Sequence, residues 1–284
     1  MEKKFPRTVV GGVSMPRILI GTNWLLGYSH TGAAADKIIT SKFSSPEAFL
    51  PVFEAYLQYD IDAVMGPIST TPIALDAVRY AQEKLGRKLI VIDTPTMNVD
   101  DTPEARREAD AVIRRSAEIG STFCLIHHSS MEELVNKNQR TITRLPDYLA
   151  MMRDHGLIPG LSAHMPEAIL YSDANGYDVE TYIQIFNCMG FLMQVEVEGV
   201  ARIIRNAKKP VMTIKPFAAG RVSPFVGLNF NWSVLRDQDM ITMGVMSEAE
   251  VHEDVEISFA ALERRFPELA GRSSPAKNQA VLQG

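Results

Sequence analysis

Short apolar runs alternate with longer amphipathic segments along most of this 284-residue chain, and this alternation constrains the fold more than any other feature. Each run has the length of a buried strand, and most end in polar residues or glycine before helical spacing of apolar residues begins. Eight runs follow this scheme, at residues 17–21, 61–65, 88–92, 123–126, 157–163, 182–186, 210–214 and 240–243. Such alternation is typical of a parallel sheet whose strands are joined by helical crossovers.

Helix start signals follow several of the runs. A capping residue precedes a proline of the first turn in Ser45-Pro46, Thr71-Pro72 and Thr102-Pro103. Ser247, with Glu250 three residues later, forms a capping box. Helical spacing also covers residues 145–155 and 198–208, whereas residues 225–235 fit either a helix or a packed loop. The stretch 22–36 is polar and glycine-rich, and its length is typical of a functional or disordered loop.

Eight strand–helix units predict a closed (β/α)₈ barrel, the TIM barrel of the α/β class, with residues 1–284 as one domain. An open doubly wound sheet is the competing architecture. That sheet would be favoured by a G-x-G-x-x-G fingerprint after the first strand, and the sequence carries none. From about residue 271 the chain is rich in Ser, Pro, Ala and Gln, which predicts a loose tail.

Composition narrows the class of partner and the compartment. The net charge is −5 and no run of Lys or Arg occurs, which argues against nucleic acid. Cys124 and Cys188 lie in apolar runs, as expected for free buried thiols in a reducing compartment. The longest uncharged run, residues 18–35, is too polar to span a membrane, and residues 8–15 make a poor signal peptide. We therefore expect a cytoplasmic protein that binds a small molecule without a membrane partner; a homo-oligomer remains open.

Active sites of such barrels lie at the carboxyl ends of the strands. Four of the six histidines fall there, namely His30, His127, His128 and His164. The other two, His155 and His252, lie in helical patterns and are expected at the surface. Side chains alternate along a strand, so of His127 and His128 we expect one in the mouth and the other directed away. His164, one strand along, is expected close to His127.

Two kinds of chemistry fit these histidines. With Asp93, His127 and His164 could bind Zn²⁺ or another divalent ion, although no two of them share a recognised ligand spacing. Acid–base catalysis by His127 or His164 without a metal is an equally good interpretation, as is a simple hydrogen bond to a loop.

Lys215 ends the seventh strand and is the remaining candidate for catalysis. A desolvated lysine can form a Schiff base or hold a phosphate or carboxylate, but an ion pair with Asp93 or Glu167 would make it structural. Trp24, Tyr28 and Trp232 could be platforms for a flat ligand or ordinary packing residues. The substrate-binding candidates at the strand ends are Asn23, Trp24, His30, His128, Asn187 and Arg221.

Short motifs spread along the whole chain resemble the aldo-keto reductase superfamily, a group of (β/α)₈ barrels that use NADPH. The resemblance lies in Leu19-Ile20-Gly21-Thr22, Cys124-Leu125-Ile126-His127, Gly160-Leu161-Ser162, Lys215-Pro216-Phe217-Ala218-Ala219-Gly220-Arg221 and the segment from Gly244 through Ser247 to Val251. The resemblance implies the barrel fold and hydride transfer by an Asp, Tyr, Lys and His acting together.

Only the histidine of that set has a counterpart, His127. The second strand ends in Met65-Gly66-Pro67 without the Asp and Tyr, and Asp93 stands where the family carries its Lys. The Arg that holds the cofactor's 2′-phosphate is absent from residues 247–251, which are acidic. These departures argue for the fold and against NAD(P) as cofactor.

Three functions are therefore carried forward, in order of preference. The first is an acid–base or metal-assisted isomerase, epimerase or lyase acting on a small polar substrate such as a sugar or sugar acid, with His127, His164, Lys215 and Asp93 in catalysis. The second is a divergent NAD(P)-dependent oxidoreductase. The third is a non-catalytic binding barrel, in which the loop 23–36 would plug the mouth.

Overall fold

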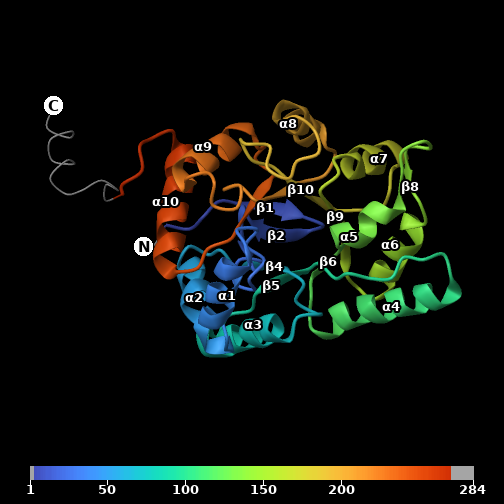
Figure 1. The fold of residues 1–284 in the computed structure, drawn as a ribbon, viewed down its shortest axis with the longest axis horizontal. Helices are drawn as coiled ribbons and strands as arrows, with labels where there is room; N and C mark the ends of the chain where they lie inside the picture. The colour runs from blue at the N-terminus through green and yellow to red at the C-terminus, as the bar shows by residue number, and fades with distance from the viewer. Residues whose placement is uncertain (1–2, 270–284) are drawn as a thin grey trace, which may run out of the picture.

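Eight parallel strands pair in a closed ring in the computed structural model, which describes residues 3–269 (Figure 1). In ring order they are β3 (Ile18–Gly21), β4 (Ala63–Gly66), β5 (Ile90–Asp93), β6 (Phe123–Ile126), β9 (Ile158–Ala163), β10 (Thr181–Ile185), β11 (Val211–Ile214) and β12 (Met240–Met243). The pairing of β12 with β3 closes the ring. The predicted (β/α)₈ barrel is confirmed, and each predicted strand matches an observed one to within two residues at either end. The expected tail from residue 271 lies outside the described residues.

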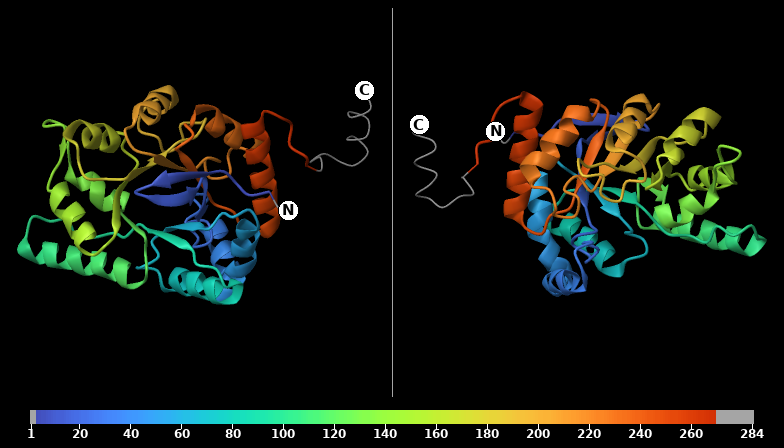
Figure 2. Two further views of the ribbon diagram at one scale, coloured as in Figure 1. Left: turned by 180° about the vertical axis from the view of Figure 1, so that it is seen from behind. Right: turned by 45° about the horizontal axis from the view of Figure 1, so that its top comes forward.

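Helices surround the barrel on all sides, as the three ribbon views show (Figures 1 and 2). They are α1 (Ala33–Lys42), α2 (Leu50–Gln58), α3 (Pro72–Leu85), α4 (Pro103–Glu118), α5 (His128–Met131), α6 (Leu145–Asp154), α7 (Glu167–Asn175), α8 (Val197–Asn206), α9 (Pro224–Val234) and α10 (Glu248–Glu263), with 3-10 turns η1 (Pro46–Phe49) and η2 (Glu132–Leu134). Thr102 and Ser247 cap α4 and α10 through their hydroxyls, as their positions predict. The ambiguous stretch 225–235 is helix α9. Sequence reasoning missed α1, α5 and α7, and α1 begins inside the expected loop 22–36.

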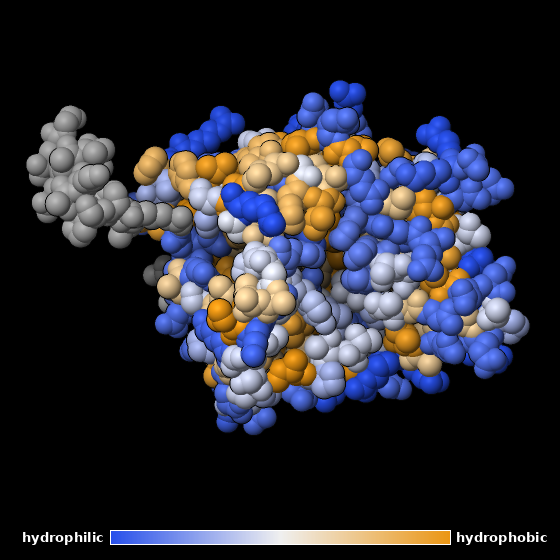
Figure 3. Space-filling model, viewed as in Figure 1, coloured by the Kyte–Doolittle hydropathy of each residue, from blue (hydrophilic) through white to orange (hydrophobic). Residues whose placement is uncertain are grey.

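The core has two layers, because each parallel strand is apolar on both faces. One layer fills the barrel and includes Leu19, Ile92, Leu125 and Met212. The other lies between the barrel and the helices. Of the described helices, none is long and apolar enough to cross a bilayer. On the face in Figure 3, hydrophilic residues occupy most of the margin and hydrophobic residues show between them.

A hairpin of β1 (Arg7–Val10) and β2 (Val13–Pro16) closes the amino end of the barrel, and it was not foreseen from the sequence. Its two-residue turn is Gly11-Gly12, with φ of +54° and +83°, values that favour glycine. Val10 and Met15 are 1% and 0% exposed and belong to the barrel-filling cluster. The hairpin therefore acts as an apolar plug, seen in blue at the centre of Figure 1.

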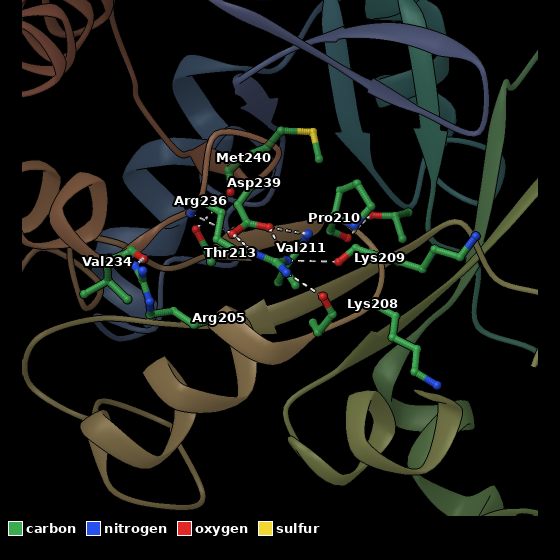
Figure 4. Close-up of polar contacts among 12 residues, drawn as sticks. Arg205, Lys208, Lys209, Pro210, Val211, Thr213, Val234, Arg236, Asp239 and Met240 are labelled. Atoms are coloured by element: carbon green, nitrogen blue, oxygen red, sulfur yellow. Dashed lines mark hydrogen bonds and ion pairs between the residues drawn. The ribbon is translucent and has the colours of Figure 1, made fainter. Parts of the chain in front are cut away.

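A buried carboxylate ties together the amino ends of β11 and β12 (Figure 4). Asp239 is fully buried and accepts hydrogen bonds from the Val211 N–H at 2.9 Å and from Arg236 at 2.7 to 2.9 Å. Arg236 also donates to the carbonyls of Ala207 and Lys209. From β3's side of the seam, Arg17 donates to the carbonyls of Asp239 and Arg236 at 3.0 and 2.8 Å. Every oxygen of the buried carboxylate is thus partnered, as burial of a charge requires.

Replacing Asp239 should therefore lower the stability of the protein much more than replacing the nearby Asp237. Asp239→Ala leaves the Arg236 guanidinium without its partner and the Val211 N–H without an acceptor, which we expect to lower the free energy of unfolding by about 3 kcal/mol or more. The matched control is Asp237→Ala. Asp237 is exposed, and its contact with Arg17 is a long one, with 3.8 Å between the nearest charged atoms. Urea unfolding of both variants measures the difference, and equal stabilities would contradict the role given to Asp239.

Candidate active site

A cavity of about 540 Å³ opens at the carboxyl ends of the strands, where the sequence placed the active site. Its wall combines strand ends with the loop after β3, which supplies Asn23, Trp24, Tyr28 and His30. That loop lines the cavity and leaves it open, so the plug expected for a non-catalytic barrel is not formed by it. Hydroxyl groups are frequent in the wall, from Thr22, Thr70, Thr71, Thr94, Thr96, Ser162 and Thr242.

Three histidines form a row on one side of this cavity. The rings of His127 and His128 lie 4.2 Å apart, and His128 stacks on His164 at 3.8 Å with an interplanar angle of 19°. All three line the cavity. The expectation that His127 and His128 point in opposite directions is wrong, because β6 ends at Ile126 and α5 begins at His128. Strand alternation no longer applies where the chain turns into a helix.

Two residues that sequence reasoning missed form hydrogen bonds to the backbone of His164. Oε1 of Glu132 accepts the backbone N–H groups of His164 and Met165. Nε2 of Gln184 donates to the carbonyl of His164 at 3.2 Å. A signal for Glu132 was available, since it follows His128 by four residues and one helical turn separates such a pair.

Burial keeps these imidazoles neutral. It lowers the pKa of His127 to about 4 and that of His164 to about 3, with further lowering from the neighbouring histidines and from Lys215. The pKa of His128 is lowered for the same reasons, first by burial and then by Lys215 and His30. At neutral pH each ring therefore carries one N–H and one lone pair.

The tautomer of His127 follows from its hydrogen bonds. Its Nδ1 lies 2.8 Å from the Ser129 hydroxyl and accepts the Ser129 backbone N–H at 3.4 Å. Since a backbone N–H can only donate, Nδ1 is the acceptor and Nε2 carries the proton. His127 can then present an N–H to a ligand in the cavity.

Lys215 faces the same cavity from the end of β11. Its backbone has a φ of +59°, an unusual value for a lysine and common at functional sites. None of the carboxylates in residues 3–269 pairs with its ammonium: Asp93 binds the Ser69 N–H and Glu167 pairs with Lys137. The two structural partners considered from the sequence are thus engaged elsewhere. Burial without a counter-charge lowers the pKa of Lys215 to about 8.

Three other predicted site residues lie outside the cavity lining. Asp93 is fully buried and accepts the Ser69 N–H at 3.0 Å, and burial raises its pKa. Its neighbour Ile92 points into the barrel, so Asp93 points outward to the helices. Asn187 shapes the turn after β10 by bonding Met189 and Phe191. Arg221 is exposed, donates to the carbonyl of Ala218 and stacks over Phe191.

The proposed metal set of His127, His164 and Asp93 is not brought together, because Asp93 faces away. Among the described residues, the group of donors with ligand atoms within 4.8 Å of one another is His128, Glu132 and His164.

Several residues expected at the surface or as platforms have structural partners. His155 bonds Asp110 and His252 bonds Tyr59, both half-buried on the helical layer. Trp232 is 7% exposed and lies against Arg17 at the seam, away from the mouth. Of the two free cysteines, Cys124 is buried as predicted and Cys188 is only half-buried.

The space beside Gly66 is filled. A Cβ on Gly66, at the end of β4, would lie 1.8 Å from Thr22 Oγ1, which is itself bonded to the Met65 carbonyl. A side chain at position 66 therefore has no room unless Thr22 moves.

Removing Lys215 should stabilise the protein. Below pH 8 the lysine is charged in both states, and its desolvation opposes folding. Lys215→Met should therefore raise the free energy of unfolding at pH 7 by on the order of 1–3 kcal/mol. Between pH 8 and 10.5 the unfolded chain binds more protons than the native one, so wild-type stability rises with pH and the difference shrinks. Denaturant unfolding at pH 7 and 10 measures this, with exposed Lys88→Met as the control; equal effects of both would contradict it.

Comparison with known proteins gives a fold and no closer relationship. No protein-family model matches the sequence, and no curated protein does. Two structures of candidate aldo-keto reductases from Pseudomonas aeruginosa share 12% identity over 92% of this chain and 98–99% of theirs, with TM-scores of 0.62 and 0.64. Aldose reductase from Giardia lamblia shares 13% identity over 94% of this chain and 91% of its own, with a TM-score of 0.51. At such identities the similarity concerns the backbone alone: the chain has an aldo-keto reductase-like (β/α)₈ barrel.

Proposed function

We propose that this cavity is the active site of an enzyme that moves a proton next to the carbonyl group of a small polar substrate, such as a sugar or sugar acid. The observation that carries the proposal is Lys215, which is half-buried, has no ionic partner within residues 3–269 and lines the same cavity as His127, His128 and His164. A cation held without a counter-charge in a cavity is suited to an anionic or electron-rich ligand. The reaction would be that of an isomerase, an epimerase or a lyase.

The size and wall of the cavity suit such a substrate. Its volume of about 540 Å³ falls within the usual range of small-molecule sites. The hydroxyls of Thr22, Thr94 and Ser162 can exchange hydrogen bonds with a polyhydroxylated ligand. Thr242 Oγ1 is buried and has no hydrogen-bond partner among the described residues.

The residues that line the cavity would divide the steps of the reaction among them. Lys215, as an ammonium, and His127, through Nε2–H, would hold the carbonyl oxygen of the substrate. When the adjacent carbon loses its proton, the C–H electron pair forms a C=C bond and the carbonyl pair moves to the oxygen. With no metal bound, a neutral ring nitrogen of His128 or His164 would accept that proton. Return of the proton to the former carbonyl carbon gives an isomer. Its return to the opposite face of the carbon that lost it gives an epimer. Expulsion of a β-leaving group instead gives a lyase product.

The NAD(P)-dependent oxidoreductase is kept as the alternative, and only the backbone similarity favours it. Of the residues that hydride transfer would need, His127 alone has a counterpart, and Thr22 occupies the space that an aspartate at position 66 would require. The acid–base proposal uses the residues that are present.

Exchange of substrate hydrogen with solvent tests the proposal whichever product is formed. A panel of aldoses, ketoses and sugar acids is incubated with the enzyme in D₂O, and deuterium at the carbon next to the carbonyl is followed by NMR. We expect exchange with at least one compound and a loss of about 10²-fold or more in His127→Asn and Lys215→Met. His155→Asn, on the helical layer, serves as the control. Exchange that persists in both cavity variants would remove these residues from the mechanism.

The pH profile separates the ammonium from an amine nucleophile. The ionisable groups facing Lys215 are His30, His127, His128 and His164, and all have lowered pKa values. They stay neutral from pH 7 to 10, so Lys215 controls this range. We expect kcat/KM to fall as pH rises through about 8, and Lys215→Arg to keep part of the activity at pH 9. A rate that rises through pH 8, with an inactive arginine variant, would indicate a Schiff base instead.

A further inference from the structure

We propose that His128, Glu132 and His164 bind a divalent transition-metal ion at the mouth of the barrel. The site rests on the proposed function only for its catalytic role; metal binding itself is a separate property. Glu132 was not among the residues that the sequence indicated. With Glu132 as the carboxylate ligand, the two histidine ligands are His128 and His164, in place of the expected His127 and His164.

The three side chains converge from two elements of the fold. His128 begins α5, and Glu132 follows four residues later, about one helical turn along the chain. The two side chains therefore lie on the same face of this helical segment. His164 follows β9 and stacks on His128 at 3.8 Å. One donor atom from each of the three lies within 4.8 Å of the other two. Ligands on one ion, each at about 2.1 Å, can be up to about 4.2 Å apart, and the two stacked rings must turn so that their lone pairs meet at one point.

The donors are available. None of the described residues makes a hydrogen bond to the ring nitrogens of His128 or His164, although both rings are half-buried. Polar atoms in such a setting usually have a partner. His127 differs, because its Nδ1 is engaged by Ser129. Two neutral imidazoles stacked without partners thus present unused lone pairs to the cavity.

The carboxylate of Glu132 is also held in a fixed position, from which it can bind an ion. Oε1 of Glu132 accepts the N–H groups of His164 and Met165, so the ligating histidine and the carboxylate fix each other. Oε2 takes no hydrogen bond from the described residues and remains for an ion. Gln184 holds the carbonyl of His164 from the next strand. Supporting bonds of this kind orient the ligands of metal sites.

The donor set selects the class of metal. Two imidazole nitrogens and one carboxylate oxygen suit Zn²⁺, Fe²⁺, Co²⁺ or Mn²⁺, whereas Mg²⁺ and Ca²⁺ prefer oxygen ligands. Three protein ligands leave positions open toward the cavity, as in catalytic sites. An ion here would lie next to His127 and could bind the substrate's hydroxyl or carbonyl oxygen.

Cobalt titration tests the site directly. Chelator-treated full-length protein is titrated with Co²⁺, whose visible absorption reports coordination, and bound Zn²⁺ is counted by mass spectrometry after dialysis. We expect one ion per chain, displacement of Co²⁺ by Zn²⁺ and no competition from millimolar Mg²⁺. His128→Asn, His164→Asn and Glu132→Gln should each weaken binding at least 10-fold. Glutamine keeps an oxygen acceptor for the two backbone N–H groups, so that variant tests the charge with little effect on the loop.

Matched controls separate this site from adventitious binding by surface histidines. His127→Asn, in ring contact with His128, and His155→Asn, on the outer helices, should bind Co²⁺ as the wild type does. Circular dichroism of each variant shows whether it is folded. Absence of stoichiometric binding to the wild type, or equal binding by the folded double variant His128→Asn/His164→Asn, would overturn the proposal.

The outcome is independent of the carbonyl chemistry. Stoichiometric cobalt lost in the ligand variants, without deuterium exchange in any substrate, would support the metal site and count against the proposed reaction. Exchange by chelator-treated protein that binds no metal would support the reaction and refute the metal site.

Discussion

The barrel depends on closing its ring between the last strand and the first. Strands β12 and β3 are separated by more than 200 residues of chain, so their pairing carries a large loop-closure entropy. At the amino end of this seam, Asp239 and Arg236 form hydrogen bonds to the backbone of Val211 and Lys209, at the start of β11 and just before it. Arg17, just before β3, donates to the backbone carbonyl of Asp239, just before β12. The strand ends at the opposite rim keep their positions because the ring is closed there. The positions of the strand ends that carry the histidines and Lys215 thus depend on contacts at the other end of the barrel as well as on the local bonds of Glu132 and Gln184.

The architecture was readable from the sequence because it depends on periodicity and punctuation. Thr71-Pro72 and Gly86 bound α3 in the structure as they do in the sequence pattern. The hairpin β1–β2 was missed because its strands are four residues long and its Gly11-Gly12 turn suggested only a broken apolar run. The turn α5 is equally short, and four residues cannot display a helical period.

The direction of individual side chains was harder to predict, for a physical reason. Parallel strands are buried on both faces, so the run Ile90–Asp93 does not reveal that Ile92 faces inward and Asp93 outward. One residue of register decides between mouth and helical layer. For His127 and His128 the deciding fact is where β6 stops, which again shifts by one or two residues without changing the pattern. Glu132 belongs to the site only through the path of the chain after β6.

The hairpin at the amino end determines how anything reaches the cavity. Val10 and Met15 fill the axis at that end, and the strands' inward side chains fill the layers above it. Within residues 3–269, the barrel axis is therefore closed at its amino end, and the cavity opens at the carboxyl ends of the strands. In the proposed enzyme, substrate and product would use the same entrance in turn, so product would have to leave before the next substrate could bind. Under this proposal a long polymer would not pass through the cavity, and only a free small molecule, or the end of a chain, would enter it.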